Sequence, residues 1–106
     1  MNRTEMALAS FRKPYSCAQT VYAAFAPITA QGMDFMRQNS GGNAPENMCG
    51  ALFAATQVAP ENADKIKRIF VEKIGDSRCS VIKRSLNVPC ENCVRTACEA
   101  LEQVQK

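Results

Sequence analysis

Hydrophobic residues recur along most of the chain with the period of an α-helix. The clearest case begins at position 17, where apolar side chains fall at i, i+4, i+7, i+8 and i+11 and so share one helical face. These residues are Cys17, Val21, Ala24, Phe25 and Ile28. Alternation with a period of two is never sustained, so no β-strand is predicted. The pattern predicts an all-α fold: a compact bundle of five to seven short helices in a single domain over residues 1–106.

Capping and turn residues set the limits of the predicted helices. Ser16 is a suitable N-cap, Pro60 favours the first turn of a helix, and Gly75 is a natural C-cap. Residues 39–47 are rich in Gly, Asn and Pro and are predicted to form a loop. The predicted helical segments are 4–13, Cys17 to about Pro27, 31–38, one that starts at about Cys49, 60–74, 78–85 and 90–105.

Four of the six cysteines occupy the same kind of position. Each lies at or near the start of a predicted helix and leads its apolar face, and the four are Cys17, Cys49, Cys79 and Cys93. An apolar-face residue points into the core, and a residue in the first turn lies near unpaired backbone N–H groups. A helix start lowers the pKa of a cysteine, and the thiolate is the form that binds metals. We therefore expect four inward-facing sulfurs in surroundings that favour thiolate.

Two further features surround these positions. Gly50 directly follows Cys49, which indicates either close approach by a cofactor, another sulfur or another backbone segment, or a tight turn out of the preceding loop. Cys90 and Cys93 form a Cys-x-x-Cys pair at the start of the last helix, a spacing used both by redox dithiols and by metal sites. Cys98 is interpreted as a packing residue.

The segments that carry these cysteines resemble the C-GCAxxG-C-C family, whose members are described as redox-active proteins. The matching segments are "YSCAQTVYAAFA" (15–26), "MCGALFA" (48–54), "FVEKIGDSRCSVIKR" (70–84) and "NCVRTACEALEQV" (92–104). The family cysteines fall on Cys17, Cys49, Cys79 and Cys93, while Ala54 stands where the central motif has glycine. A related domain accompanies the split-Soret cytochrome, where it is associated with an iron–sulfur cluster, so the resemblance implies a cluster here too.

Composition narrows the chemistry. The chain has 106 residues, is 46% hydrophobic and contains no histidine. The missing histidine excludes Ser-His-Asp and Cys-His catalysis within the chain and any zinc site that uses imidazole. No phosphate loop or cofactor fingerprint is visible either. We therefore expect a redox or electron-transfer accessory that serves an unidentified redox partner protein, and no self-contained enzyme.

Charge and hydropathy limit the other partners. The net charge is only +3, and the basic clusters at 65–68 and 83–84 lie in helical patterns, where they are interpreted as solvated faces. No nucleic-acid partner is therefore predicted. The apolar run 17–30 is too short and too interrupted to span a bilayer, so no membrane insertion is predicted. Because residues 1–13 lack the apolar core of a signal peptide, a cytoplasmic location is expected.

Three functions are compatible with these residues. The first is an iron–sulfur cluster or other thiolate-bound metal held by Cys17, Cys49, Cys79 and Cys93. The second is metal-free dithiol–disulfide exchange by Cys90 and Cys93 or by a cross-helix pair such as Cys17 and Cys49. The third is a structural or interaction domain whose cysteines only pack. Four nearby cations are interpreted as solvated charges: Arg78, Lys83, Arg84 and Arg95.

Overall fold

The computed structural model describes residues 16–25, 29–40, 44 and 47–104, and this part of the chain is all-α, as predicted. It contains six α-helices, within the predicted range, and an isolated antiparallel bridge between Met48 and Arg78 in place of any strand. The predicted helix over 4–13 lies outside the described residues. The α-helices are α2 (Cys17–Phe25), α3 (Ala30–Gln38), α4 (Gly50–Val58), α5 (Ala63–Ile74), α6 (Cys79–Arg84) and α7 (Cys90–Val104), and a 3-10 turn, η2 (Pro60–Asn62), precedes α5.

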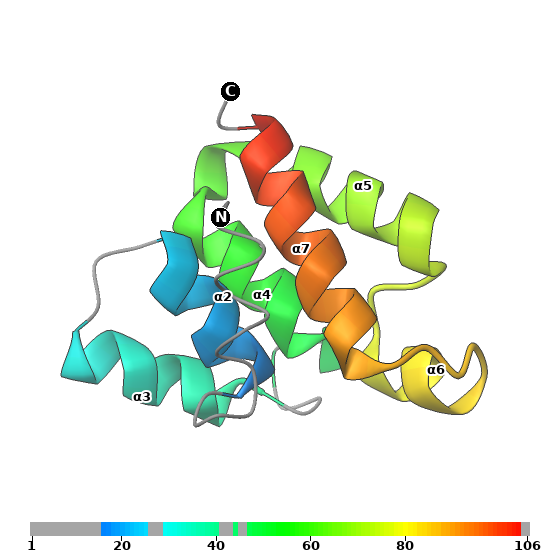
Figure 1. The fold of residues 1–106 in the computed structure, drawn as a ribbon, viewed down its shortest axis with the longest axis horizontal. Helices are drawn as coiled ribbons and strands as arrows, with labels where there is room; N and C mark the ends of the chain where they lie inside the picture. Colours follow the sequence, from blue (N-terminus) through cyan, green and yellow to red (C-terminus); the bar gives the residue numbers. More distant parts are fainter. Residues whose placement is uncertain (1–15, 26–28, 41–43, 45–46, 105–106) are drawn as a thin grey trace.

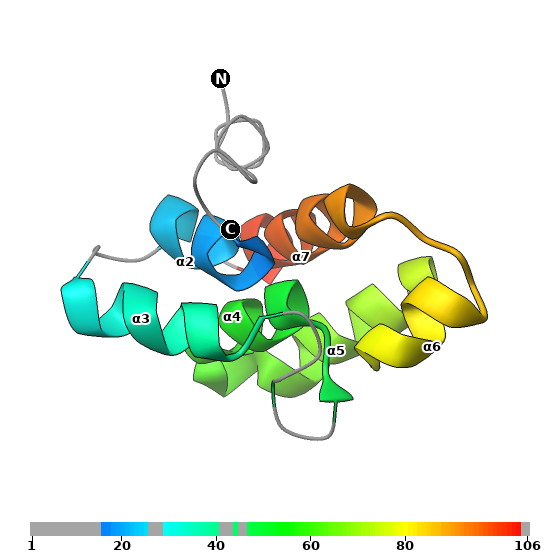
Figure 2. The same cartoon turned by 90° about the horizontal axis from the view of Figure 1, so that it is seen from below.

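Helix α4 is the centre of the bundle (Figure 1). It packs against α2, α5 and α7, and α7 also packs against both α2 and α5. Seen from below, α2 and α7 lie over α4, while α3 and α6 lie at opposite ends of the molecule (Figure 2). The N-terminal ends of α2, α4, α6 and α7 can thereby approach one another, although they are far apart in sequence.

Burial of α4 differs from the sequence prediction. The helical period places Cys49, Leu52, Phe53 and Thr56 on one apolar face, whereas residues 50–55 are buried on every side and Thr56 is only half-buried. Three alanines in this stretch have short side chains, which let the neighbouring helices approach α4 all round. A helix that is apolar on all faces belongs in the core of the bundle rather than at its surface.

The predicted caps of two helices are confirmed. Ser16 and Gln19 form a reciprocal capping box at the start of α2: the Gln19 N–H donates to Ser16 Oγ at 3.4 Å, and the Ser16 N–H donates to Gln19 Oε1 at 3.0 Å. Gly75 ends α5 with a φ of 114°, a conformation that side chains rarely adopt, and its N–H donates to the Val71 carbonyl.

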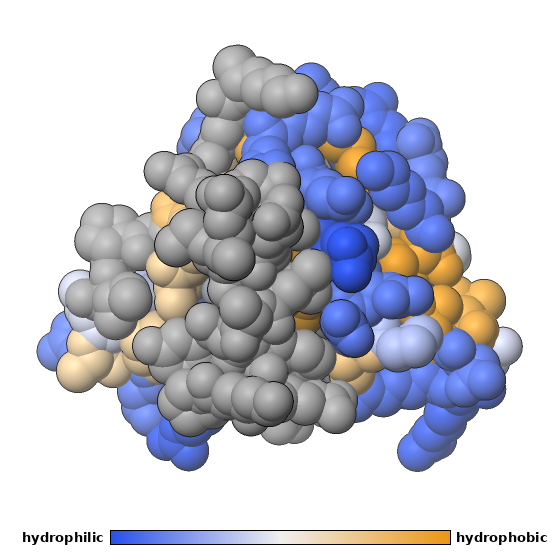
Figure 3. All heavy atoms as spheres, viewed as in Figure 1, coloured by the Kyte–Doolittle hydropathy of each residue, from blue (hydrophilic) through white to orange (hydrophobic). Residues whose placement is uncertain are grey.

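The surface near α6 is partly apolar. Figure 3 shows hydrophobic residues gathered on the side of the molecule where α6 and the segment leading to α7 lie. Leu86, in that segment, is 41% exposed. Within the described ranges, no helix combines the length and the apolar character needed to cross a bilayer.

Candidate thiol site

Hydrogen bonds between the residues just before α4 and those around the start of α6 hold these two helix starts together. The Cys49 N–H donates to the Ser77 carbonyl at 2.8 Å, immediately before α6. Asn47, in a left-handed conformation with φ of 60°, accepts a hydrogen bond from the Ser80 N–H at 3.0 Å and another from the Ser80 hydroxyl. Asn47 therefore satisfies an unpaired donor in the first turn of α6 from another part of the chain. This pairing fixes Cys49 and Cys79 at adjacent helix starts.

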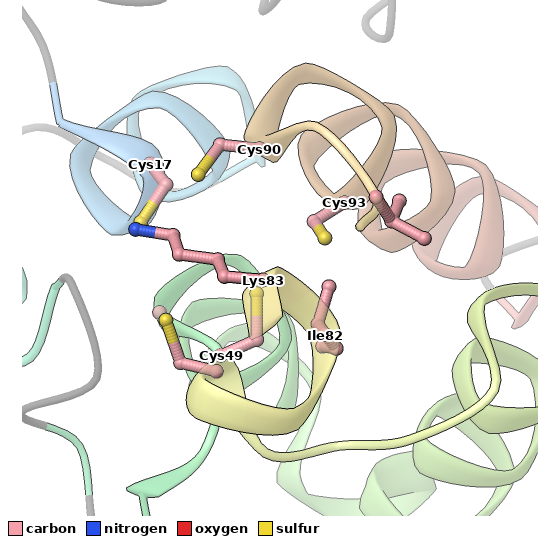
Figure 4. A pocket seen from close by; sticks show the side chains of 9 residues that line it. Cys17, Cys49, Ile82, Lys83, Cys90 and Cys93 are labelled. Atoms are coloured by element: carbon pink, nitrogen blue, oxygen red, sulfur yellow. The ribbon is translucent and has the colours of Figure 1, made fainter. Parts of the chain in front are cut away.

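A single pocket collects sulfurs from the starts of four helices (Figure 4). Its lining residues are Cys17, Cys49, Gly50, Cys79, Ile82, Lys83, Val88, Cys90 and Cys93. The cavity volume is about 20 Å³, which is room for about one water molecule. The lining contains five sulfurs and no oxygen-bearing side chain.

The structure brings together all four cysteines that their sequence positions singled out. Cys17 and Cys79 are the first residues of α2 and α6, Cys49 is the N-cap of α4, and Cys93 lies one turn into α7. Cys90, the first residue of α7, adds a fifth sulfur that the metal-site prediction left out.

Cys98 is separate from this group. Its side chain is fully buried, and it does not line the pocket, which fits its interpretation as a packing residue. None of the six cysteines, all of which lie in the described residues, forms a disulfide.

Gly50 is explained by its neighbours. A Cβ atom at this position would lie 2.7 Å from Cys17 Sγ, 3.0 Å from Ser40 Cα and 3.1 Å from the Asn39 carbonyl oxygen. Two of the three close approaches considered from the sequence therefore occur: another sulfur and another backbone segment reach the start of α4. Glycine at this position makes room for the Cys17 sulfur in the pocket.

The expectation that helix starts favour thiolates is wrong for Cys49. A hydrogen bond to Cys93, burial of the thiol and the charge of Cys93 together raise the pKa of Cys49 well above its ordinary value. The backbone N–H groups of Leu52 and Ala51 do lower this pKa, as a helix start should. The neighbouring sulfur and the burial outweigh them.

The pKa of Cys79 is also raised, although less strongly than that of Cys49. Burial raises the pKa of its thiol first, and the nearby sulfurs of Cys49, Cys90 and Cys17 raise it further. The positive charge of Lys83 acts in the opposite direction. Burial and neighbouring sulfurs thus disfavour the ionised forms of both Cys49 and Cys79.

Lys83 is exposed, as its interpretation as a solvated charge expects, and it also lines the pocket. Its side chain crosses the pocket mouth from α6 and its ammonium group lies toward Cys17 and Cys90 (Figure 4). The charges of Cys90 and Cys79 and a hydrogen bond to Cys90 raise the pKa of Lys83, although burial lowers it. Arg78 is also exposed but does not line the pocket, and it pairs with Asp76 at 3.1 Å. Position i+4 from Cys79 on a helix was the available sequence signal for Lys83.

The cysteine sulfurs of the pocket form a donor set for a metal that prefers thiolate ligands. Sulfur-only ligands suit iron–sulfur clusters, Zn²⁺ and Cu⁺, and four thiolates complete a tetrahedral site. Within the described residues, no group of three or more His, Cys, Asp or Glu side chains is already arranged to hold a metal ion. The chemistry of the pocket fits a thiophilic metal, and binding requires its sulfurs to close around the ion.

Comparison with protein-family models, curated proteins and solved structures returned no match. The resemblance to the C-GCAxxG-C-C family therefore stays a prediction from the residues quoted above.

Proposed function

We propose that this protein is redox-active and binds an iron–sulfur cluster or another thiophilic metal through the thiolates of Cys17, Cys49, Cys79 and Cys93. The observation that carries the proposal is that these four cysteines, from four different helices, line one pocket. A structural role for scattered cysteines would not require their sulfurs to meet. The protein would act in electron transfer or sensing with a redox partner protein, and not as a self-contained enzyme.

The charge balance of the pocket supports a bound cation. Burial and neighbouring sulfurs raise the pKa values of Cys49 and Cys79, so these two thiols hold their protons more tightly than ordinary cysteines do. A thiophilic cation replaces those protons, because coordination deprotonates a thiol outright. Lys83 adds positive charge at the pocket mouth, where it offsets part of the charge of several thiolates. A bound iron–sulfur cluster would supply one-electron transfer.

A cytoplasmic location is part of this proposal. Six cysteines that form no disulfide, five of them around one pocket, persist most readily in a reducing compartment. A reducing compartment also keeps the thiolate ligands available for metal.

A second candidate is metal-free dithiol–disulfide exchange. The specific observation in its favour is Cys90, which is half-buried, lies at the start of α7 and is hydrogen bonded to Lys83. An accessible thiol beside a cation is the usual arrangement of an attacking cysteine, and Cys93 is placed one turn away to resolve the product.

One experiment separates the two candidates. The protein is purified without oxygen, and one sample is used for an absorption spectrum, metal analysis and a thiol titration. Broad visible absorption with stoichiometric iron supports a cluster, and a colourless protein with stoichiometric zinc or copper supports a single metal ion. A colourless, metal-free protein whose thiols titrate freely would overturn the metal proposal and leave the dithiol candidate.

A further inference from the structure

The five cysteines around the pocket differ in exposure. Three of them are buried, and these are Cys49, Cys79 and Cys93. Cys17 and Cys90 are only half-buried. The ammonium group of the exposed Lys83 lies toward this half-buried pair, which places Cys17 and Cys90 at the pocket mouth (Figure 4). The pocket therefore has an inner group of three sulfurs and an outer pair.

The inner group is anchored by backbone contacts between its helices. The Cys49 N–H donates to the Ser77 carbonyl at 2.8 Å. The Asn47 side chain accepts from the Ser80 N–H at 3.0 Å, so the starts of α4 and α6 keep one relative position. Cys93 lies one turn into α7, a helix that packs on α4. Three sulfurs on anchored elements supply all but one of the ligands of a tetrahedral site.

Two sulfurs compete for the remaining ligand position. Cys17 and Cys90 are the first residues of α2 and α7, two helices that pack against one another. Both line the same cavity of about 20 Å³, so each borders the space in which an ion would be held. Cys90 also stands three residues before Cys93, and this Cys-x-x-Cys spacing lets two sulfurs bind one metal. The outer pair is thus alike in exposure and in access to the cavity.

We infer that Cys17 and Cys90 are interchangeable fourth ligands, and that the metal is loaded and unloaded at the pocket mouth by exchange between them. The inference rests on the proposed metal site and adds a metal-transfer role to it. When Cys90 replaces Cys17, the Cys90 thiol loses its proton as its sulfur bonds to the ion. The Cys17 thiolate leaves the ion and takes up a proton. One metal–sulfur bond forms, one breaks, and no electron is transferred.

The fifth sulfur gives the site a way to pass its metal to another molecule. A site with four sulfurs must open one position before an incoming ligand can bind. Here the outer pair exchanges while the inner group stays bound, so the solvent side of the ion is already the side on which ligands change. Soft ligands compete best for a thiophilic ion. The expected exchange partner is therefore a molecule that presents thiols.

Labelling of the zinc-loaded wild type tests the exchange directly. Reduced protein carrying one Zn²⁺ is given a brief pulse of N-ethylmaleimide, and the labelled residues are located by tandem mass spectrometry. We expect one label per chain among the pocket cysteines, on Cys17 in some chains and on Cys90 in others, with the inner group protected. Label confined to one member of the outer pair would overturn the inference and leave the zinc site standing. Labelling of the inner group despite zinc would refute the metal site as well.

Serine variants test the interchange by affinity. Cys17→Ser and Cys90→Ser should each bind Zn²⁺ with nearly wild-type affinity in competition with a chromophoric chelator. The double variant should bind it at least about tenfold more weakly, and circular dichroism should confirm that all three variants are folded. A single variant that binds as weakly as the double variant would overturn the inference.

The same variants test the transfer role by rate. Zinc-loaded protein is mixed with excess dimercaptosuccinate, a small dithiol, and the zinc that stays with the protein is measured after rapid desalting. Each single variant lacks the fifth sulfur and should lose its zinc several-fold more slowly than the wild type. The control Cys98→Ser, altered outside the pocket, should match the wild type. Wild-type rates in either single variant would refute the transfer role, whereas a wild type that binds no zinc would refute the proposed site itself.

Discussion

Replacing Gly50 with alanine tests whether the pocket is packed as described. The added Cβ atom would lie 2.7 Å from Cys17 Sγ, closer than such atoms approach in folded proteins, and 3.0 Å from Ser40 Cα. The Cys17 side chain would have to rotate, and the backbone at Ser40 would have to give way slightly. Overpacking of this kind costs about 1–3 kcal/mol. Because Gly50 is the first residue of α4, the gain from alanine's helix propensity offsets little of that cost.

We therefore expect Gly50→Ala to lower the free energy of unfolding by about 2 kcal/mol. Removing the Cys17 sulfur should relieve part of this cost, because the tightest contact disappears. In a Cys17→Ala background, the same substitution should cost about 1 kcal/mol, since the contacts with Ser40 and Asn39 remain. The difference, about 1 kcal/mol, is a coupling energy between positions 17 and 50.

Urea unfolding of the four proteins, followed by far-ultraviolet circular dichroism, measures this coupling. All samples should be reduced and metal-free, so that neither disulfides nor bound ions contribute. Additivity within about 0.5 kcal/mol would refute the reasoning, because residues that do not touch are additive to that degree. It would mean that Cys17 does not occupy the space beside Gly50.

Three further predictions concern stability. Burial and two nearby glutamates raise the pKa of Cys98 to about 12 from 9.0, so the folded state keeps a proton that the unfolded chain loses above about pH 9. Urea unfolding should show stability falling by about 1.4 kcal/mol between pH 8 and pH 10 from this group, and a Cys98→Ala variant with the wild-type slope would contradict this. Asn47→Gly should lose the hydrogen bond that Asn47 accepts from the first turn of α6 and lower the free energy of unfolding by about 1 kcal/mol. Asn47→Asp should keep the hydrogen bond and the stability. Equal loss of stability in the two variants, measured by urea unfolding, would exclude capping of α6 by Asn47. Gly75→Ala should lower the free energy of unfolding by about 1 kcal/mol or more, because alanine is strained at the φ of 114°. An unchanged midpoint of urea unfolding would refute this backbone strain.

Much of the fold could be predicted because its signals are local. Helical periodicity needs only the spacing of apolar residues, and Ser16 and Gly75 act on the helices they adjoin. Burial of α4 on all sides could not be predicted in the same way. Its alanines are compatible with a half-exposed helix, and only the positions of three neighbouring helices make every face of α4 internal.

The site was predictable for a different reason, and only in part. Cysteines that start helices on the apolar side point inward, which was enough to select four sulfurs of the pocket. The places of Cys90 and Lys83 in the pocket were not predicted, because they depend on how α6 and α7 approach each other. The pKa of Cys49 was misjudged because the local helix-start effect is opposed by Cys93, which is 44 positions away in sequence (93 minus 49).

The most direct test of the central claim is a zinc titration of the reduced, metal-free protein against a chromophoric chelator. Wild-type protein and the control variant Cys98→Ser should each bind one Zn²⁺ per chain, because four thiolates complete a tetrahedral site. Cys49→Ser should bind it at least about tenfold more weakly, and circular dichroism should confirm that it is folded. Failure of the wild type to bind, or equal weakening in both variants, would contradict the assignment of Cys17, Cys49, Cys79 and Cys93 as one metal site.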